Sequence, residues 1–525
     1  MKEGKKKERK KKVFFSPFSQ FFLLSFFKFA KQSKAEVIDL TRGGLAELPA
    51  SVGKAKAKEL ILLENDLTEL PDELGDMQML EILDLTKNRL TSLPSSIGRV
   101  KTLKHLFLAN NKLFYKPITS ELGKLNRLTK LDLSFNQLDE LPACIAQLAA
   151  LQYLDLSNNA LKAILPEYGK LENLVTVNLS QNQLASLPPE VGGWRSLKEL
   201  DCSDNQLPRL PVQLAQCKGA IVLKFSNNKL REVPEEFAGL ANLQELWLRD
   251  NAGLEALPQL AAFRALSKLS LRNTKLDSVP PDVCNLPALT VLDLRDNSQM
   301  RSIPAGIGRL RTLLSLDIGG NKLSNLPTEL GSLIALQSLD LRNNNLTTDT
   351  LVREIFQLVE LRKLFLSGNQ LAVLSDDIGR LRNLQELDIS NNRITRLPER
   401  IGELKQLQRL NLSGNKVNAL PPSIGNLKQL TTLDIKTNEV ADLPPEFGQL
   451  TELTKFDMSH NMITELPWEM GDLYNLVTLS VEKNPLVIPP KPVVVKGTQA
   501  IVGWLKANEK QGRQAKVSGL GLVKK

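Results

Sequence analysis

Histidine and cysteine are scarce in this chain of 525 residues, which has two of the first and four of the second. His105 and His460 are far apart in the sequence, so they offer little material for histidine catalysis or a histidine-rich metal site. The cysteines show no CxxC spacing and no cluster at either end of the chain. Secreted repeat proteins usually place disulfide-bonded caps there, so a reduced, intracellular setting is expected.

Motifs that carry chemistry are also missing. The sequence contains no GxxxxGK[ST] phosphate loop, kinase glycine loop, GxSxG nucleophile elbow or HExxH zinc motif. We therefore predict no catalytic, cofactor-binding or metal-binding residues, no cofactor, and a protein that is not an enzyme.

Positive charge is confined to the two ends of the chain. The formal net charge is +10, but residues 1–34 carry +9 and residues 491–525 carry +7, which leaves −6 for the residues between them. A body that is mildly acidic does not offer the basic face that nucleic-acid binding requires. No nucleic-acid partner is expected.

One repeated pattern dominates the remaining sequence. The string LxxLxLxxNxL occurs, for example, at Leu128, Leu131, Leu133, Asn136 and Leu138. Its Asn position recurs twenty times between Gly43 and Asn484, eighteen times as Asn, and fifteen of the nineteen steps are 23 residues long. This is the leucine-rich repeat signature, and a fixed period of this length indicates a stack of similar units.

The repeat predicts an α/β solenoid, a leucine-rich repeat horseshoe of about 20 repeats. In each unit the LxL segment alternates with period two, which predicts a short strand with its leucines inward. Stacked strands form a parallel concave sheet. The Pro-started LPxxIGxL segment is too short for a long helix and predicts 3₁₀ or extended turns on the convex side. The Asn amide is expected to satisfy backbone groups in a buried turn.

Two repeats are stretched to 25 residues by linkers at residues 114–117 and 347–350, and both lose the Leu-Pro pair. We expect both linkers to bulge from the convex side or the rim.

Counting back from the Asn, positions −6, −4 and −2 point outward and line the concave face, where solenoids generally bind partners. Position −4 is usually Asp, which suits a solvated surface. Three repeats place an aromatic residue there instead: Phe107, Trp247 and Phe365. Aromatic residues on an open surface are candidate partner contacts.

Position −2 is usually small, yet four repeats carry Arg249, Arg272, Arg295 and Arg342. Like charges on adjacent strands repel unless acidic groups answer them. Either neighbouring aspartates pair with these arginines within the chain, or an acidic partner does. Trp and Arg are enriched at binding hot spots, so Trp247 beside the arginines is the strongest interface candidate.

The two ends of the chain lie outside the repeat pattern. We therefore predict three segments: a basic, Phe-rich N-terminal extension at 1–34, a solenoid at 35–490, and a C-terminal cap with a basic tail at 491–525. Residues 13–29 contain eight Phe behind a block of Lys. Three interpretations stay open for this stretch: a signal peptide cleaved near Ala35, an interfacial helix giving peripheral membrane contact through residues 5–29, or a disordered or capping extension. Residues 12–15 also match a loose docking string of phosphatase partners. Near the other end, Thr498 is expected to cap a short helix through Lys506.

The repeated LPxxIGxLxxLxxLxLxxNxL, as at residues 397–402, resembles intracellular leucine-rich repeat proteins of the Ras-group-related type. The ending from Asn484 through Thr498 is similar to the closing unit of that group and of a related leucine-rich repeat-containing protein. The resemblance covers residues 35 to about 508. It implies a cytoplasmic scaffold in signal transduction, with Ras-type small GTPases or phosphatases as protein partners, and it supplies no catalytic motif.

The first hypothesis is therefore a non-enzymatic scaffold that binds a protein on its concave face. The second is a secreted or cell-surface recognition module, which predicts cleavage near Ala35 and a glycan at Asn345.

Overall fold

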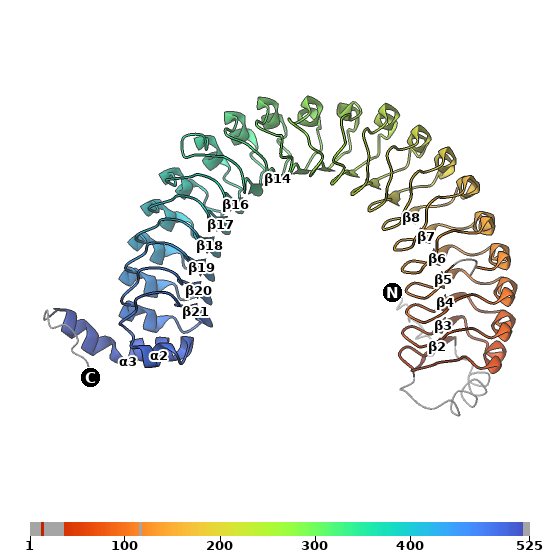
Figure 1. The fold of residues 1–525 in the computed structure, drawn as a ribbon, viewed down its shortest axis with the longest axis horizontal. Coiled ribbons are helices and arrows are strands. Elements are labelled where there is room, and N and C mark those ends of the chain that lie inside the picture. The colour runs from red at the N-terminus through yellow and green to blue at the C-terminus, as the bar shows by residue number, and fades with distance from the viewer. Residues whose placement is uncertain (1–11, 15–35, 115–117, 518–525) are drawn as a thin grey trace, which may run out of the picture. The chain divides into compact units, whose positions relative to one another are not determined.

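The computed structural model describes residues 12–14, 36–114 and 118–517. The chain divides into two units, Met1–Leu266 and Ser267–Lys525. Within each unit, three-residue strands run parallel along the inner side, and short helices lie along the outer side (Figure 1). This arrangement is the predicted solenoid of stacked repeats.

The strands follow one another in chain order, each paired in register with the next within its unit. Those of the first unit are β1 Lys12–Phe14, β2 Val37–Asp39, β3 Glu59–Ile61, β4 Ile82–Asp84, β5 His105–Phe107, β6 Lys130–Asp132, β7 Tyr153–Asp155, β8 Thr176–Asn178, β9 Glu199–Asp201, β10 Val222–Lys224 and β11 Glu245–Trp247. Those of the second unit are β12 Lys268–Ser270, β13 Val291–Asp293, β14 Ser315–Asp317, β15 Ser338–Asp340, β16 Lys363–Phe365, β17 Glu386–Asp388, β18 Arg409–Asn411, β19 Thr432–Asp434, β20 Lys455–Asp457 and β21 Thr478–Ser480.

The outer helices are of the 3₁₀ type, as predicted for the Leu-Pro segments. In the first unit they are η1 Ala50–Lys54, η2 Asp72–Asp76, η3 Ser95–Arg99, η4 Ser120–Lys124, η5 Ala143–Gln147, η6 Pro166–Lys170, η7 Pro189–Gly193, η8 Val212–Gln216, η9 Glu235–Gly239 and η10 Leu260–Ala262. In the second they are η11 Pro281–Asn285, η12 Ala305–Arg309, η13 Thr328–Ser332, η14 Arg353–Gln357, η15 Asp376–Arg380, η16 Glu399–Glu403, η17 Pro422–Asn426, η18 Pro445–Gln449 and η19 Trp468–Asp472.

Most of these helices carry a glycine where they meet the next repeat. At Gly98 a Cβ atom would lie 2.5 Å from the backbone oxygen of Glu121 in the following helix. A side chain at this position would force the two helices apart, because Cβ atoms do not approach backbone oxygens so closely. The glycine therefore sets the close packing of successive 3₁₀ helices.

The repeated asparagines form a ladder of buried hydrogen bonds. Asn228 donates from Nδ2 to the carbonyl oxygens of Cys202 (3.0 Å) and Phe225 (3.1 Å), and its Oδ1 accepts from the N–H of Leu207 (3.0 Å). Each amide thus joins its own turn to the preceding repeat and satisfies backbone groups that would otherwise be unpaired. This confirms the structural role predicted for the Asn position.

The residue before each ladder position turns the chain out of its strand with a positive φ angle. In some repeats the residue at this turn is glycine, such as Gly414, but in one repeat it is Thr437, with a φ angle of 56°. A β-branched residue is strained in this conformation, so the turn there opposes the intrinsic preference of its side chain.

The N-terminal edge of the first unit carries strand β1, which pairs in parallel with β2 so that Lys12 lies beside Val37. Of the three interpretations left open for this stretch, an interfacial helix through residues 5–29 is wrong at residues 12–14, which form a strand. Residues 1–11 and 15–35, on which the other predictions for the N-terminal extension fall, lie outside the described residues. The same holds for residues 115–117 of the first long linker.

The C-terminal cap is formed by α2 Lys491–Val494 and α3 Thr498–Val517. Ile501, Val502 and Leu505 of α3 are buried. Two details of the prediction are wrong. The helix continues past Lys506, and the Thr498 hydroxyl accepts a hydrogen bond from Leu479 of β21 (3.0 Å) instead of capping its own helix. The cap thereby pairs with a backbone group on the strand at this edge of the second unit.

Candidate protein-binding surface

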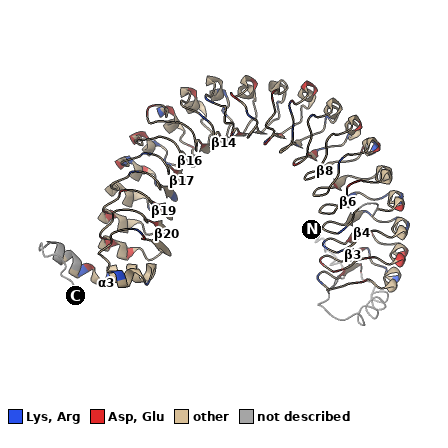
Figure 2. Ribbon diagram, in the orientation of Figure 1, with Lys and Arg blue, Asp and Glu red and all other residues tan. Residues whose placement is uncertain are grey.

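The inner face of each unit is built by the two-residue alternation of its strands. In β14 the middle residue, Leu316, is fully buried, whereas Ser315 and Asp317 on either side reach the surface. The same pattern recurs along the stack and confirms the predicted outward positions. Figure 2 shows acidic and basic residues interspersed along the repeats of both units.

The predicted binding residues fall in separate places. Phe107 lies on β5, and Trp247 and Arg249 lie on and just after β11, with five strands between them in the first unit. The remaining residues, Arg272, Arg295, Arg342 and Phe365, belong to the second unit. Of these, Arg342 and Phe365 are in direct contact, with the guanidinium carbon 4.8 Å from the centre of the ring.

Each of the four arginines has an acidic neighbour within the chain. Arg249 lies 3.9 Å from Asp250, and Arg272 lies 2.8 Å from Asp296. Arg295 bridges Asp293 and Asp317 at 3.2 and 3.0 Å, and Arg342 pairs with Asp340. Aspartates within the chain therefore pair with these arginines, which was one of the two alternatives. No external acid is needed to balance their charges.

Three carboxylates stand side by side on the inner face of the second unit. Asp293, Asp317 and Asp340 occupy matching positions on β13, β14 and β15. Burial, and then the charge of Asp340, raise the pKa of Asp317 to about 7, although Arg295 acts in the opposite direction. This part of the face gains or loses a proton near neutral pH and attracts positive charge when the proton leaves.

Next to it, a groove of about 280 Å³ crosses β16 to β19. It is lined by Arg342, Phe365, Glu386, Leu387, Asp388, Arg409, Leu410, Asn411, Thr432 and Asp434. Arg409 lies 2.9 Å from Glu386, and this contact holds the pKa of the Glu386 carboxyl below its usual range. Phe365 contributes a partly exposed ring between charged walls. We call this hollow the inner groove.

Sequence reasoning found Arg342 and Phe365 but missed the opposite wall of the inner groove, Glu386 and Arg409. Both occupy position −6, an outward position at which no candidate residue was predicted. The signal was present, because neighbouring repeats place opposite charges at this position.

The two aromatic residues of the first unit have polar neighbours. Trp247 donates from its indole N–H to Glu245 (3.0 Å) and lies beside Lys224 of the adjacent strand. Phe107 lies 6.1 Å from the ring of His105, measured between ring centres. Both rings remain partly exposed, so each is a smaller candidate contact than the inner groove.

All four cysteines are free and buried, and burial raises the pKa of the Cys217 thiol to about 11. Among the described residues there is no group of three or more His, Cys, Asp or Glu placed to hold a metal ion. No helix within the described ranges has the length and apolar character needed to cross a membrane.

Comparison with known protein families shows that much of the chain matches leucine-rich repeat models. A model described as a leucine-rich repeat region matches residues 251–372, 336–416, 368–440 and 400–484. Models described as leucine-rich repeat match residues 120–161 and 79–100, and one described as leucine-rich repeats in two copies matches residues 149–191. These matches fall in both units.

Among curated proteins, leucine-rich repeat protein lrrA of Dictyostelium discoideum is 54% identical over 97 residues. The matched stretch is 18% of this chain and 19% of that protein, so this chain spans about a fifth of the relative.

Two solved structures are similar over most of the chain. A leucine-rich repeat protein of Leptospira interrogans is 32% identical with a TM-score of 0.57, and the match covers 80% of this chain and 94% of that one. The plant peptide hormone receptor RGFR1, solved in complex with RGF2, is 26% identical with a TM-score of 0.59, and 86% of each chain is covered.

Proposed function

Because this chain belongs to the leucine-rich repeat proteins, we propose that it is a non-enzymatic scaffold whose protein partner binds along the inner groove. The observation that carries the proposal is the groove itself. It combines a partly exposed aromatic ring, Phe365, with guanidinium groups on both sides, Arg342 and Arg409. Aromatic and arginine side chains are enriched at protein interfaces, and a few buried residues of such types often dominate the binding energy.

The balance of charge indicates the kind of segment that fits the groove. Its arginines are already paired with Asp340 and Glu386, so a purely acidic partner would have to break these pairs. A partner with an apolar side chain over Phe365 and polar groups toward the walls leaves the pairs intact. The similarity to RGFR1, a plant peptide hormone receptor solved in complex with RGF2, supports a peptide-like segment as the contact.

The sequence resemblance suggests which partners to test first. We propose a cytoplasmic role in signal transduction around a Ras-type small GTPase, with a phosphatase as the next partner to examine. The four free, buried cysteines support a reducing compartment.

The experiment measures binding of purified Ras-type GTPases, loaded with a GTP analogue or with GDP, to the full chain. The test variant is Phe365→Asp, because Asp is the usual residue at this position and the repeat is expected to keep its fold. We expect a roughly 30-fold loss of affinity, about 2 kcal/mol, as for an aromatic hot spot. The control is Arg311→Glu, a charge reversal on an exposed arginine away from the inner groove.

Equal affinity of wild type and Phe365→Asp would show that the inner groove is not the interface. Failure of every GTPase to bind in either nucleotide state would reject this partner class, and the same pair of variants would then be tested with phosphatases.

A second function is favoured by the similarity to a plant receptor. In this alternative the chain is a secreted or cell-surface recognition module. Mass spectrometry of the native protein distinguishes the two, since the secreted form is expected to begin near Ala35 and to carry a glycan at Asn345. An intact N-terminus in the cytosol rejects it.

A further inference from the structure

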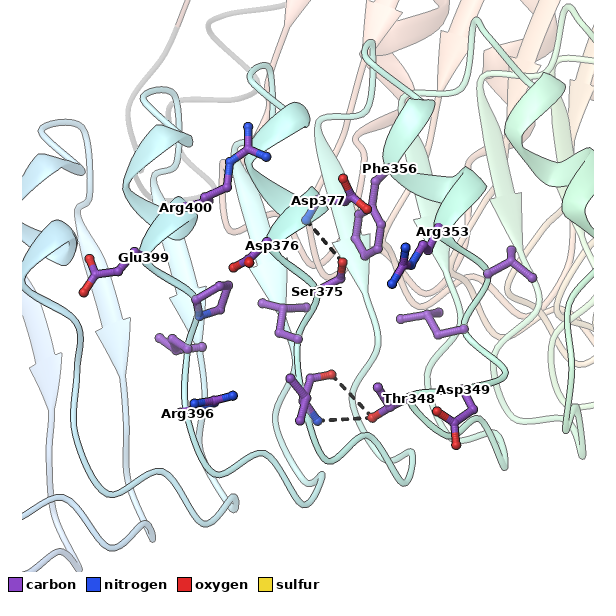
Figure 3. A pocket seen from close by; sticks show the side chains of 16 residues that line it. Thr348, Asp349, Arg353, Phe356, Ser375, Asp376, Asp377, Arg396, Glu399 and Arg400 are labelled. Carbon is purple, nitrogen blue, oxygen red and sulfur yellow. Dashed lines mark hydrogen bonds between the residues drawn. The ribbon is translucent and has the colours of Figure 1, made fainter.

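A larger hollow lies on the flank of the second unit, between the asparagine turns and the 3₁₀ helices η14, η15 and η16 (Figure 3). It has a volume of about 1010 Å³. The long linker at residues 347–350 forms one side of it. We call it the flank pocket; it shares no lining residue with the inner groove.

The flank pocket opens where one side chain departs from the repeat. Phe356 of η14 occupies the helix position that is Gly331 in the preceding repeat and Gly379 in the following one. At Gly331, a Cβ atom would lie 2.8 Å from the Cβ of Glu354 in the next helix, so η13 and η14 pack closely only because glycine is there. A phenyl ring at the same position, almost fully buried, holds η15 away from η14.

The wall made by the long linker is anchored by hydrogen bonds. The Thr348 hydroxyl accepts from the N–H groups of Ala372 (3.0 Å) and Val373 (3.1 Å) in the next repeat. Thr347 donates its N–H to the Thr350 hydroxyl (2.9 Å). The pocket is therefore preformed, which lowers the entropic cost of binding.

The floor of the pocket is apolar. Phe356 lines the pocket, is almost fully buried, and is labelled among the lining side chains in Figure 3. Leu351, Leu374 and Leu397 are buried below the surface, and Val373 is exposed at its edge. Because Phe356 and the leucines are already nearly covered, an apolar side chain of a ligand would gain free energy mainly by covering Val373 at the edge of this floor.

The rim carries charges of both signs, only some of which form ion pairs with other described residues. Arg353 and Arg396 form no ion pair with another described residue, and neither do Asp349, Asp376 and Glu399. By contrast, Asp377 pairs with Arg380 at 3.0 Å and Arg400 with Glu403 at 2.9 Å. Free charges of both signs therefore surround the apolar floor.

This combination excludes several ligand classes. A metal ion is not favoured, because the described acidic residues form no group able to hold one. A phosphate or other multivalent anion would meet three free carboxylates on the same rim. The pocket volume is at the upper end of the range for small-molecule sites. It is also larger than a single side chain of a partner would fill.

We propose that the flank pocket binds a short extended peptide segment of a protein partner, in which an apolar side chain is flanked by one acidic and one basic side chain. The apolar side chain lies on the floor and covers Val373 at its edge. The acidic side chain faces Arg353 or Arg396, and the basic one faces the carboxylates. This gives the scaffold a second binding site, independent of the inner groove.

The test uses the full chain and a phage-displayed library of random nine-residue peptides, selected on wild type and counter-selected on Phe356→Gly. That substitution restores the usual glycine and is expected to let η14 and η15 close. A second variant, Arg353→Glu with Arg396→Glu, keeps the pocket open and reverses its free positive charges. Two controls leave the site alone: Arg362→Glu on the same unit, and Phe365→Asp in the inner groove.

We expect enriched peptides that combine an apolar residue with charges of both signs. They should bind at least tenfold more weakly to Phe356→Gly and to the double Glu variant, and equally well to both controls. The proposal is overturned if no peptide depends on Phe356, if the peptides bind the double Glu variant as tightly as wild type, or if Phe365→Asp abolishes their binding. Enrichment of purely acidic peptides would also overturn it, because it would indicate a simple anion site.

Discussion

Replacing Asp317 with Asn tests the electrostatics of the inner face most directly. Asp317 lies on β14 between Asp293 and Asp340, its partners in the strand pairing. Because burial and the charge of Asp340 raise its pKa to about 7, ionising Asp317 costs the folded state free energy. Asn keeps the shape of the side chain and can still accept the hydrogen bond from Gly319.

The sign of the effect follows from the direction of the pKa. When folding raises the pKa of a carboxyl, its contribution to stability is fully present at pH values below the ordinary pKa of 3.8. That contribution is lost as the pH rises toward the folded-state pKa of about 7. Since a difference of one unit in pKa corresponds to about 1.4 kcal/mol, the free energy of unfolding lost through this carboxyl is at most about 4 kcal/mol. The side chain is 21% exposed, and solvent screening reduces this value.

We therefore expect Asp317→Asn to stabilise the second unit by about 1 to 3 kcal/mol at pH 8, and by close to nothing at pH 4. Hydrogen exchange followed by mass spectrometry, on fragments spanning β13 to β15, measures the local free energy of opening. This local measurement is preferred because a stack of repeats need not unfold in one step. Urea unfolding of the whole chain at the same pH values gives an independent comparison.

The matched control is Ser315→Ala, on the same strand and facing the same side, whose effect should not depend on pH. The reasoning would be refuted if Asp317→Asn were no more stable than wild type at pH 8. It would also be refuted if the difference were the same at both pH values. Either result would mean that Arg295, 3.0 Å away, keeps the carboxylate charged at low cost.

Two further predictions concern the repeat itself. Asn297→Ala removes a fully buried amide that donates to the carbonyl oxygens of Leu271 (2.9 Å) and Leu294 (3.0 Å). Because these carbonyl groups lose a partner, we expect the free energy of unfolding to fall by about 2 to 5 kcal/mol, as measured by urea unfolding. A fall of less than about 1 kcal/mol would contradict the role of the ladder. Thr437→Gly removes a β-branched residue from a turn with φ 56° and should raise stability by about 1 kcal/mol, whereas Gly414→Thr should lower it. Thermal unfolding of both variants checks this, and destabilisation by Thr437→Gly would show that its side chain stabilises the turn more than strain opposes it.

The regular part of the fold could be predicted closely. Each repeat packs mainly on the repeats before and after it, so one period in the sequence determines the strand positions, their register and the ladder of Asn residues. The prediction failed where a residue serves the edge of a unit. Thr498 bonds the last strand instead of its own helix, and residues 12–14 form a strand that pairs with β2 where one of the three open interpretations placed a helix.

The candidate sites could be predicted only in part. Phe365 and Arg342 stood out as departures from the consensus of their positions, and they do line the inner groove. The pairing of Arg342 with Asp340, and of Arg409 with Glu386, depends on how side chains turn across neighbouring strands. A residue pattern shows which charges are near one another but not which pairs form.

The sequence by itself determined that this protein is a solenoid of repeats, that its strands present every second side chain to the surface, and that its asparagines are structural. These properties follow from a 23-residue period and from the alternation of buried and exposed residues along a strand. Only the tertiary structure decided that the prominent arginines are internally paired and that a pocket opens on the flank. Both depend on distances between repeats, since a single Phe356 in place of glycine changes how closely two helices pack.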